Sequence, residues 1–359
     1  MMMTMSNDTV RLGLISFEHM HAYSYARCLN QLAEAELVAI ADRDAERLEQ
    51  AARQFAVQAA YSDYHKLLER EDITAVIVCS ANDEHAAITF AAAEAGKHVL
   101  CEKPLALSLD DGQRMIEVCR KNGLKLQVAF VCRYDPLYRQ AKELVDAGEI
   151  GTIKVMVGTN RGRLPPGWFV DPARAGGGAV LDHSVHVVDL MRWFTGSEVQ
   201  TVYAQAGTLL HPDLAVEDCG LLLLEFANGA IGSVDPSWSR PASFPFYGDM
   251  TMEVLGSEGA IYFNDNRPVL SVFRAEGRTP FHLESFATDA DLEMIRHFVR
   301  CIVEDHPPLA GGEDGLKALE VALAAYTSAH TGQPVSLPLA MSGQDTVTLP
   351  RLSLTRVGE

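Results

Sequence analysis

The first third of the chain alternates short apolar runs with segments of helical spacing. The runs are rich in Val, Ile and Leu and cover residues 10–15, 36–41, 58–61, 74–79, 97–101 and 124–129, of which 58–61 is the weakest. Between two of them, Leu48, Ala51, Ala52 and Phe55 recur on one helix face. Apolar strands that alternate with amphipathic helices are typical of a parallel sheet covered on both faces. We therefore predict a doubly wound α/β domain of the Rossmann type over residues 1–129.

After residue 130 the pattern changes to neighbouring strands. A helix is expected over 135–147, ending at Gly148. The Asn228-Gly229 pair predicts a hairpin turn, because both residues tolerate positive φ. Strand-like runs lie at 152–160, 199–208, 218–226, 230–238, 250–255 and 259–263, and helical patterns return at 288–304 and 313–330. We predict a second, α+β domain over 130–340 with a large, mostly antiparallel open sheet, and a surface tail over 341–359.

Composition narrows the classes of function. A chain of 359 residues is long enough for two domains, and no apolar run approaches the roughly 18–20 residues that a membrane-spanning helix needs. The amino terminus has no export signal, so a cytoplasmic location is expected. The net charge of −18 would repel nucleic acid and anionic lipid, which leaves a small molecule as the expected partner. The seven cysteines are never closer than 13 residues, so neither a disulfide framework nor a zinc motif is visible, and no metal is expected.

The turn after the first strand lacks the glycines of a dinucleotide site. A G-x-G-x-x-G loop normally holds pyrophosphate at a helix amino terminus. Its three glycine positions align here with Ser16, Glu18 and His21. A carboxylate about 4 Å from a phosphate costs roughly 4 kcal/mol at an effective dielectric near 20, more than the ~0.3–1 kcal/mol that a helix dipole returns. Either Glu18 turns away or the pyrophosphate is not held in the usual pose; an ordinary turn with solvated polar residues explains the segment equally well.

The second predicted strand ends at an acidic residue. Asp42 is placed to accept hydrogen bonds from the adenosine ribose hydroxyls, which favours NAD. Arg43 could instead pair with a 2′-phosphate, so NADP remains an alternative. Helix capping by Asp42 or Asp44 is an equally good structural explanation.

Lys103 follows the fifth strand of the first domain, in the string AGKHVLCEKPLAL. A residue at the carboxyl end of a parallel strand faces the crevice where such sheets bind ligands. Burial there lowers the pKa of a lysine, which suits it to proton transfer. By spacing alone, a solvated surface lysine is the simpler explanation.

The string AGKHVLCEKPLAL closely resembles the hallmark of the Gfo/Idh/MocA oxidoreductases, a family of NAD(P)-dependent sugar and inositol dehydrogenases. Further segments resemble the family in the same order: SANDEHAAITFAAAEAGKHV, AFVCRYDPLY, GWFVDPARAGGGAVLDHSVHVVDLMRWFTG, VEDCGLLLLEFANGAIGSVDPSWSR and GEDGLKALEVALAAYTSAHTGQPVSLP. The resemblance spans residues 10–338. It implies a cofactor domain followed by a substrate-binding and oligomerisation domain, in a homodimer or homotetramer.

The resemblance also implies the catalytic groups Lys103, Asp182 and His186. Hydride would pass between a nicotinamide cofactor and a secondary alcohol of a sugar, polyol or inositol-like substrate. His186 would exchange the hydroxyl proton and Lys103 would polarise the oxygen. Asp182 and His186 lie four residues apart, so they share a helix face; a capping aspartate with a packed histidine is the structural alternative.

Two further sets of candidates follow from the resemblance. Asn82 and His85 match an Asn-x-x-His beside the nicotinamide ribose, although Ala81 replaces the usual proline. The cofactor candidates are Ser16, Phe17, His21, Asp42, Arg43, Ser80, Asn82, His85, Glu102 and Lys103. The substrate candidates are Lys103, Arg133, Trp168, Asp182, His186 and Trp238. Of these, Arg133 could instead form an interdomain salt bridge, and each tryptophan could be core.

Three alternatives stay open. The chain could be a ligand-binding or regulatory member of the same fold, or an enzyme that uses NAD for transient oxidation during glycoside cleavage. His19 and His21 also resemble the HxH metal pair of barrel amidohydrolases, to which His183 and His186 could add ligands. That last alternative requires eight βα units, which the pattern does not show.

Overall fold

The computed structural model describes residues 9–245, 248–264, 267–274, 281–285 and 289–340, so the predicted tail at 341–359 lies outside the described residues. The chain divides into two compact units. The first contains residues 1–106, 111–134 and 289–314, and the second contains 107–110, 135–288 and 315–359. The predicted boundary at residue 129 lies close to the division at 134, whereas the return of 289–314 to the first unit was not predicted.

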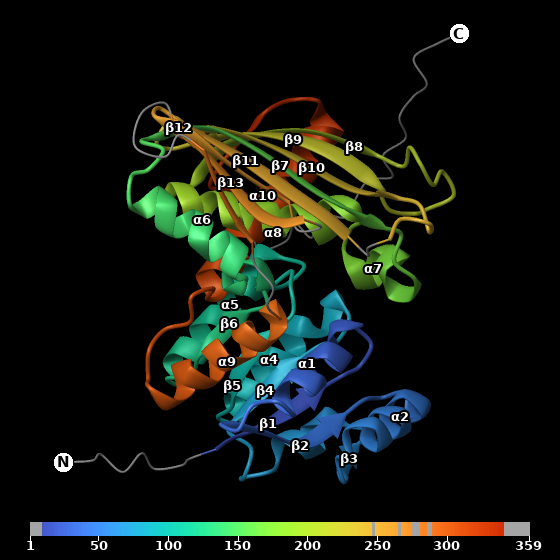
Figure 1. Cartoon of the computed structure of the whole chain (residues 1–359). Helices are drawn as coiled ribbons and strands as arrows, with labels where there is room; N and C mark the ends of the chain where they lie inside the picture. Colours follow the sequence, from blue (N-terminus) through green and yellow to red (C-terminus); the bar gives the residue numbers. More distant parts are fainter. Residues whose placement is uncertain (1–8, 246–247, 265–266, 275–280, 286–288, 341–359) are drawn as a thin grey trace, which may run out of the picture. The chain divides into compact units, whose positions relative to one another are not determined.

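A parallel sheet of six strands forms the centre of the first unit (Figure 1). Its order is β3-β2-β1-β4-β5-β6, and every pair is parallel. The strands are β1 (Val10–Ile15), β2 (Ala35–Ala41), β3 (Ala59–Tyr61), β4 (Ala75–Val78), β5 (His98–Cys101) and β6 (Leu126–Val128). The strand order reverses between β1 and β4, which opens a ligand crevice at the carboxyl edge. The predicted doubly wound domain is confirmed, and the barrel hydrolase alternative is wrong.

The helices of the first unit follow its strands. They are α1 (His21–Leu29), α2 (Ala45–Phe55), α3 (Tyr64–Leu68), the 3-10 turn η1 (Asn82–Glu84), α4 (His85–Glu94), α5 (Leu109–Lys121), η2 (Val131–Tyr134) and α9 (Ala290–Val303). Asp44 caps α2 by accepting the Arg47 N–H at 2.9 Å. The expectation that Asp42 or Asp44 caps this helix is therefore confirmed for Asp44. The late helix α9 packs against α1 and β1.

A mixed sheet of nine strands forms the second unit, in the order β14-β13-β12-β11-β7-β10-β9-β8-β15. The strands are β7 (Ile153–Arg163), β8 (Val199–Gly207), β9 (Cys219–Phe226), β10 (Ile231–Arg240), β11 (Gly248–Gly256), β12 (Gly259–Asn264), β13 (Arg267–Arg274), β14 (Phe281–Ser285) and β15 (Val335–Ser336). Only β7 and β10 pair in parallel among the described pairs. The mostly antiparallel sheet is therefore confirmed, as is the β9–β10 hairpin, where Gly229 has φ +83°.

Helix α8 covers one face of this sheet (Figure 1). The unit's helices are α6 (Pro136–Asp146), η3 (Gly167–Val170), α7 (Pro172–Ala175), α8 (Ala179–Thr195) and α10 (Gly312–Thr331). A Cβ at Gly158 of β7 would lie 2.4 Å from Val187 Cγ1, so the sheet and α8 are in close contact there. Among the described residues, no helix is long and apolar enough to cross a membrane.

Candidate functional site

The β1–α1 turn keeps a backbone that favours glycine although it has none. Ser16 has φ +71°, a left-handed conformation that costs a non-glycine residue about 1–2 kcal/mol. Its N–H donates to Ala41 O at 2.7 Å, and its Oγ accepts the Glu18 N–H at 3.1 Å. The next link is the His19 N–H, which donates to Cys79 O at 3.0 Å. The turn is therefore fixed between β2 and the end of β4.

Asp42 connects this turn to helix α2. Its buried carboxylate accepts the N–H groups of Phe17 at 2.7 Å and Asp44 at 2.8 Å. It also accepts Nε and Nη2 of Arg47 at 3.0 and 2.8 Å. Arg43, the arginine that we singled out from the sequence, instead forms an ion pair with Glu84. The guanidinium beside the expected ribose-binding carboxylate is therefore that of Arg47, one helical turn further on.

Arg47 is also a positive charge in the surroundings of Glu18. Burial by itself lowers the pKa of Arg47, but the hydrogen bonds and charge of Asp42, with further contributions from Glu18 and Asp44, raise it overall. Because both hydrogen bonds from the Arg47 guanidinium go to Asp42, its single charge is shared among three carboxylates. It therefore offsets only part of the repulsion expected between Glu18 and a phosphate.

Residues after β4 and β5 are linked to one another. His85 is buried, and its Nδ1 lies 2.8 Å from Pro104 O while its Nε2 lies 3.4 Å from Ser80 O. Burial lowers the pKa of His85, which keeps the ring neutral. Ser80 Oγ donates to Ala81 O at 3.1 Å, and Asn82 is buried at the start of η1. The cofactor candidates Ser80, Asn82 and His85 therefore lie together beside the residues that follow Lys103.

Glu102 is a fully buried carboxylate at the carboxyl end of β5. It accepts the Tyr25 hydroxyl at 2.6 Å and the Lys103 N–H at 3.1 Å. His21 Nδ1 lies 2.9 Å and His19 Nδ1 3.9 Å from Glu102 Oε1. Burial alone raises the pKa of Glu102, but the charges of His19, His21 and Lys103 bring it well below its ordinary range. The structure thus brings the candidates His21, Glu102 and Lys103 together, and adds His19 and Tyr25.

The start of α8 in the second unit is built around Glu217. Its Oε1 accepts the N–H groups of Gly178 and Val180, each at 2.9 Å, and the Tyr326 hydroxyl at 2.8 Å. A Cβ at Gly178 would lie 1.9 Å from the Glu217 carbonyl oxygen, so only glycine fits there. Burial raises the pKa of Glu217 to about 7, although its hydrogen bonds oppose this. Neither Glu217 nor Tyr326 was a candidate from the sequence, because their contact spans 109 residues.

The carboxylate of Asp182 lies in the first turn of α8. Trp238 Nε1 donates to Asp182 Oδ2 at 3.2 Å, and His183 Nε2 lies 3.2 Å from the same oxygen. His183 Nδ1 lies 2.9 Å from Asn160 O, so the ring connects the Asp182 carboxylate to the backbone of β7. The sequence pointed to His186 as the partner of Asp182. His186 is buried one turn further along the helix.

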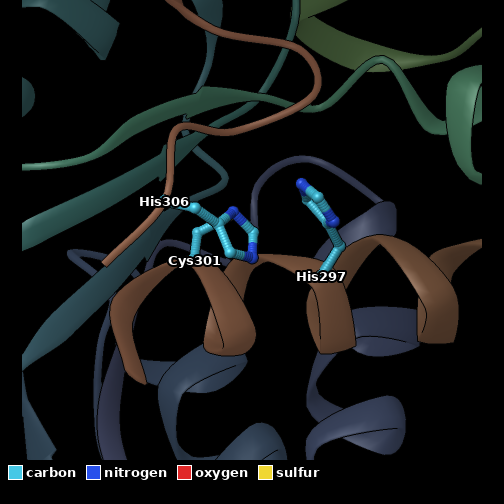
Figure 2. A group of neighbouring side chains, drawn as sticks. All are labelled: His297, Cys301 and His306. Carbon is cyan, nitrogen blue, oxygen red and sulfur yellow. The ribbon is translucent and has the colours of Figure 1, made fainter. Parts of the chain in front are cut away.

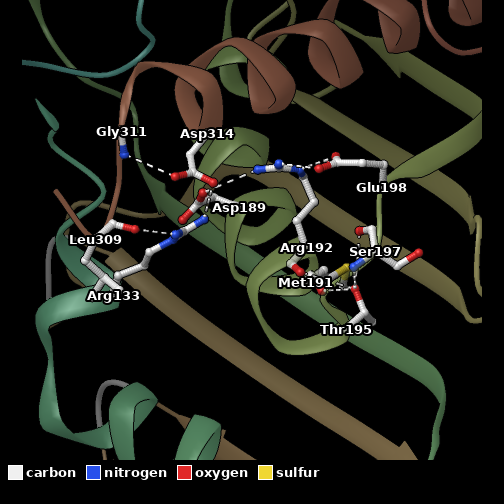
Figure 3. A network of polar contacts seen from close by, with 10 residues as sticks. All are labelled: Arg133, Asp189, Met191, Arg192, Thr195, Ser197, Glu198, Leu309, Gly311 and Asp314. Carbon is white, nitrogen blue, oxygen red and sulfur yellow. Dashed lines mark hydrogen bonds and ion pairs between the residues drawn. The ribbon is translucent and has the colours of Figure 1, made fainter. Parts of the chain in front are cut away.

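The remaining substrate candidates are engaged in structural contacts. Arg133 donates to Leu309 O at 2.7 Å and to Asp314 Oδ1 at 2.9 Å within the first unit (Figure 3). Trp168 is buried and stacks on Phe169, with ring centroids 3.9 Å apart. Trp238 is 1% exposed and packs in the core, so it holds Asp182 rather than offering a ring face. At the other end of α8, Arg192 pairs with Glu198 in the same network view (Figure 3).

Comparison with known families gives matches in both units. Residues 11–130 match the oxidoreductase family with an NAD-binding Rossmann fold. Residues 138–262 match the GFO/IDH/MocA C-terminal domain. The first match ends at residue 130 and the second begins at residue 138.

Individual proteins agree with the family matches. The chain is 34% identical to myo-inositol 2-dehydrogenase of Thermotoga maritima over 337 residues, which is 91% of this chain and 98% of that protein. It is 32% identical to scyllo-inositol 2-dehydrogenase (NAD(+)) of Bacillus subtilis, covering 91% and 96%. A levoglucosan dehydrogenase solved with NADH and levoglucosan is 26% identical, with a TM-score of 0.85 over 92% of this chain and all of that one. This chain therefore belongs to the GFO/IDH/MocA oxidoreductases, and its first unit is an NAD-binding Rossmann domain.

Proposed function

We propose that the protein oxidises a secondary alcohol of an inositol-like cyclitol, polyol or sugar and transfers the hydride to NAD. The observation that carries the proposal is the position of Lys103, which is buried directly after β5 at the carboxyl edge of the parallel sheet. Ligands of such sheets bind at that edge. The inositol 2-dehydrogenases that resemble this chain along nearly its whole length support the substrate class.

The described residues fit a dinucleotide. Ser16 keeps the turn in its glycine-like form, and α1 begins at His21 without a side-chain cap, which leaves its amino terminus for a pyrophosphate. Asp42 and Arg47 would meet the adenosine ribose, and the guanidinium could also receive a 2′-phosphate. When bound, NAD supplies the hydride acceptor. Titrations with NAD and NADP, repeated with Arg47→Ala, will show which form the pair selects.

Within this proposal the catalytic groups are Lys103, Asp182 and His186. Lys103 would donate a hydrogen bond to the substrate oxygen, and His186 would take the hydroxyl proton. Asp182 would orient a substrate hydroxyl, while Trp238 and His183 hold its carboxylate in place. His183 thus joins the candidates as a positioning residue for Asp182.

A variant at Lys103 tests the assignment. NADH formation should be measured with myo-inositol, scyllo-inositol, D-xylose and levoglucosan. On the preferred alcohol, Lys103→Ala should lower kcat/KM by about 10²- to 10⁴-fold, the usual contribution of proton transfer, while NAD binding survives. The exposed Lys66, which pairs with Glu69, provides the matched control Lys66→Ala, which should behave as wild type.

Three results would contradict the proposal. Unchanged turnover in Lys103→Ala would remove the lysine from the reaction. A wild-type protein that is stabilised by these alcohols without any NADH signal would instead be a binding or regulatory member. NAD-dependent release of nitrophenol from nitrophenyl glycosides would favour transient oxidation during glycoside cleavage.

We also propose that the face of the nine-stranded sheet opposite α8 joins copies of the chain. Opposite α8, a row of paired positions carries the exposed side chains of Leu223, Val157 and Tyr262. Leu221 and Ile231 add exposed apolar area on neighbouring strands. Ser233 and Glu253 lie between the first three side chains in this row, so the face combines apolar side chains with polar positions, as protein interfaces commonly do. A single-particle mass measurement of wild type and Leu223→Glu will test it, since the charge should dissociate a homodimer or homotetramer.

A cytoplasmic location is the last part of the proposal. None of the seven cysteines, all of which lie in the described residues, forms a disulfide, and six of them are buried. Free thiols persist in reducing compartments. Cell fractionation checks this directly, and recovery of the protein outside the cytoplasm would contradict it.

A further inference from the structure

Two groups of metal-ligating side chains lie in the described part of the first unit. The His–Cys–His cluster consists of His297, Cys301 and His306, on α9 and the loop after it (Figure 2). The His–His–Glu cluster consists of His19, His21 and Glu102. In each, the ligand atoms lie within 4.8 Å of one another. We propose that the His–His–Glu cluster binds a divalent transition-metal ion, with zinc favoured. This revises the expectation, drawn from the sequence, that no metal is bound.

The spacing of the cluster suits a single ion. Metal–nitrogen and metal–oxygen bonds of about 2.0–2.2 Å at the tetrahedral angle place ligand atoms roughly 3.3–3.5 Å apart. His21 Nδ1 and His19 Nδ1 lie 2.9 and 3.9 Å from Glu102 Oε1, on either side of that value. Side-chain shifts of about half an ångström would bring both pairs to the ideal spacing.

The hydrogen bonds show which contacts an ion would replace. His19 Nδ1 accepts the His21 N–H at 3.2 Å, so this nitrogen presents the lone pair that a metal needs. Coordination exchanges this long bond for a metal–nitrogen bond. His21 Nδ1 lies 2.9 Å from Glu102 Oε1, and an ion held by both atoms would replace that contact as well.

The residues around the cluster orient its carboxylate. The Lys103 N–H holds Glu102 Oε2 at 3.1 Å, and the Tyr25 hydroxyl donates to Oε1 at 2.6 Å. Partners of this kind fix a ligating carboxylate and raise the affinity of a site. His19 and Glu102 are fully buried, whereas the side chain of His21 is 36% exposed. The cluster is therefore rigid on its inner side and open to solvent through His21.

The charges nearby favour a cation. Glu102 and Asp291 both interact with His21, and Lys103 supplies one opposing positive charge. Two imidazoles and one carboxylate form the donor set of catalytic zinc sites, which keep a fourth position open for water or substrate. The cluster lies at the carboxyl ends of β1 and β5, the edge at which this sheet binds ligands.

The His–Cys–His cluster is less suited to an ion. His306 Nδ1 lies 3.1 Å from Pro307 O, and this cluster has a thiol where the other has a carboxylate. Burial raises the pKa of the Cys301 thiol to about 12, which opposes the thiolate that zinc requires. This cluster provides the internal control for the experiment.

The test measures metal binding to the full chain in the absence of nucleotide and substrate. A negative result would therefore contradict the metal site without contradicting the proposed dehydrogenase activity. Protein made without a histidine tag is dialysed against EDTA, then titrated with Zn²⁺ in competition with a chromogenic chelator, and the bound metal is counted by mass spectrometry. We expect one ion per chain. His21→Ala and His19→Gln should weaken binding at least tenfold, and Cys301→Ser should leave it unchanged.

Cobalt substitution keeps the proposal open to contradiction even if a variant folds poorly. Co²⁺ bound to the wild-type cluster should show the visible absorption of a nitrogen and oxygen site, without thiolate charge transfer. A thiolate band, or loss of the ion in Cys301→Ser, would move the site to the other cluster. Absence of stoichiometric metal in the wild type, or full binding in a correctly folded His21→Ala, would overturn the proposal.

Discussion

The β1–α1 turn of the first unit and the start of α8 in the second begin helices in opposite ways. The first has lost the glycines of its motif and carries Ser16 in a left-handed conformation. The second keeps three consecutive glycines, and at Gly178 the Glu217 backbone leaves no room for a Cβ. The comparison teaches that the atoms packed against a position, rather than its place in a motif, decide whether glycine is required.

The largest expected effect is at Gly178. In Gly178→Ala the new Cβ would meet the Glu217 carbonyl oxygen at 1.9 Å, and a backbone atom cannot rotate away. We expect a loss of about 3 kcal/mol or more in the free energy of unfolding, or no folded second unit. Urea denaturation followed by circular dichroism measures it.

Gly311 supplies the matched control. A Cβ there would have its nearest neighbour at 3.7 Å, so Gly311→Ala should remain close to wild type. Equal stability of the two variants would show that α8 can shift, and would remove the contrast between the two helix starts.

The second effect is a pH dependence at Glu217. Its pKa is about 7 in the folded protein against an ordinary value of 4.5. Between these values the unfolded chain loses the proton while the folded protein keeps it, so stability falls as pH rises through this window and the loss is complete above about pH 7. The difference is about 3 kcal/mol.

Glu217→Gln isolates this term, since the amide oxygen can still accept hydrogen bonds but does not titrate. The variant should lose less stability than wild type between pH 5 and about 7.5, as measured by denaturation at each pH. Parallel profiles for the two proteins would mean that Glu217 titrates normally, and that the start of α8 is not built on a buried acid.

The smallest effect is at Ser16. Ser16→Gly removes the left-handed strain of about 1 kcal/mol. Glycine, however, has more conformational entropy in the unfolded chain, which destabilises the folded state by a similar amount. The Glu18 N–H also loses its acceptor. We expect stability within about 0.5 kcal/mol of wild type. Ser16→Ala keeps the strain and loses the acceptor, so it should be about 1 kcal/mol less stable. The same denaturation assay decides, and a large loss in Ser16→Gly would mean that the serine itself is essential.

The sequence was sufficient for the two sheets because strand signals are local. The apolar residues of Val10–Ile15 predict a strand, and the pair Asn228-Gly229 predicts a turn, without information from the rest of the chain. Helix α9 was identified as a helix but not as part of the first unit, since its apolar stripe does not specify which surface it will cover. Strands β13, β14 and β15 were not predicted.

The candidate site was predicted where a motif was contiguous. Lys103 and Glu102 follow one strand, and the structure brings them together with His21. The contacts of Arg47 with Asp42 and of His183 with Asp182 could not be inferred, because side-chain direction on a helix start depends on the exact first residue. Glu217 is distant from α8 in the sequence, and only folding brings its carboxylate to Gly178 and Val180.

The first unit is not a continuous piece of chain, since it is completed by residues 289–314. About four fifths of the protein must therefore be synthesised before α9 can reach α1 and β1. A nascent cofactor domain emerging from the ribosome has its six strands early but lacks this cover. The apolar surface that α9 covers in the folded protein therefore stays exposed, or bound by a chaperone, until translation is almost finished.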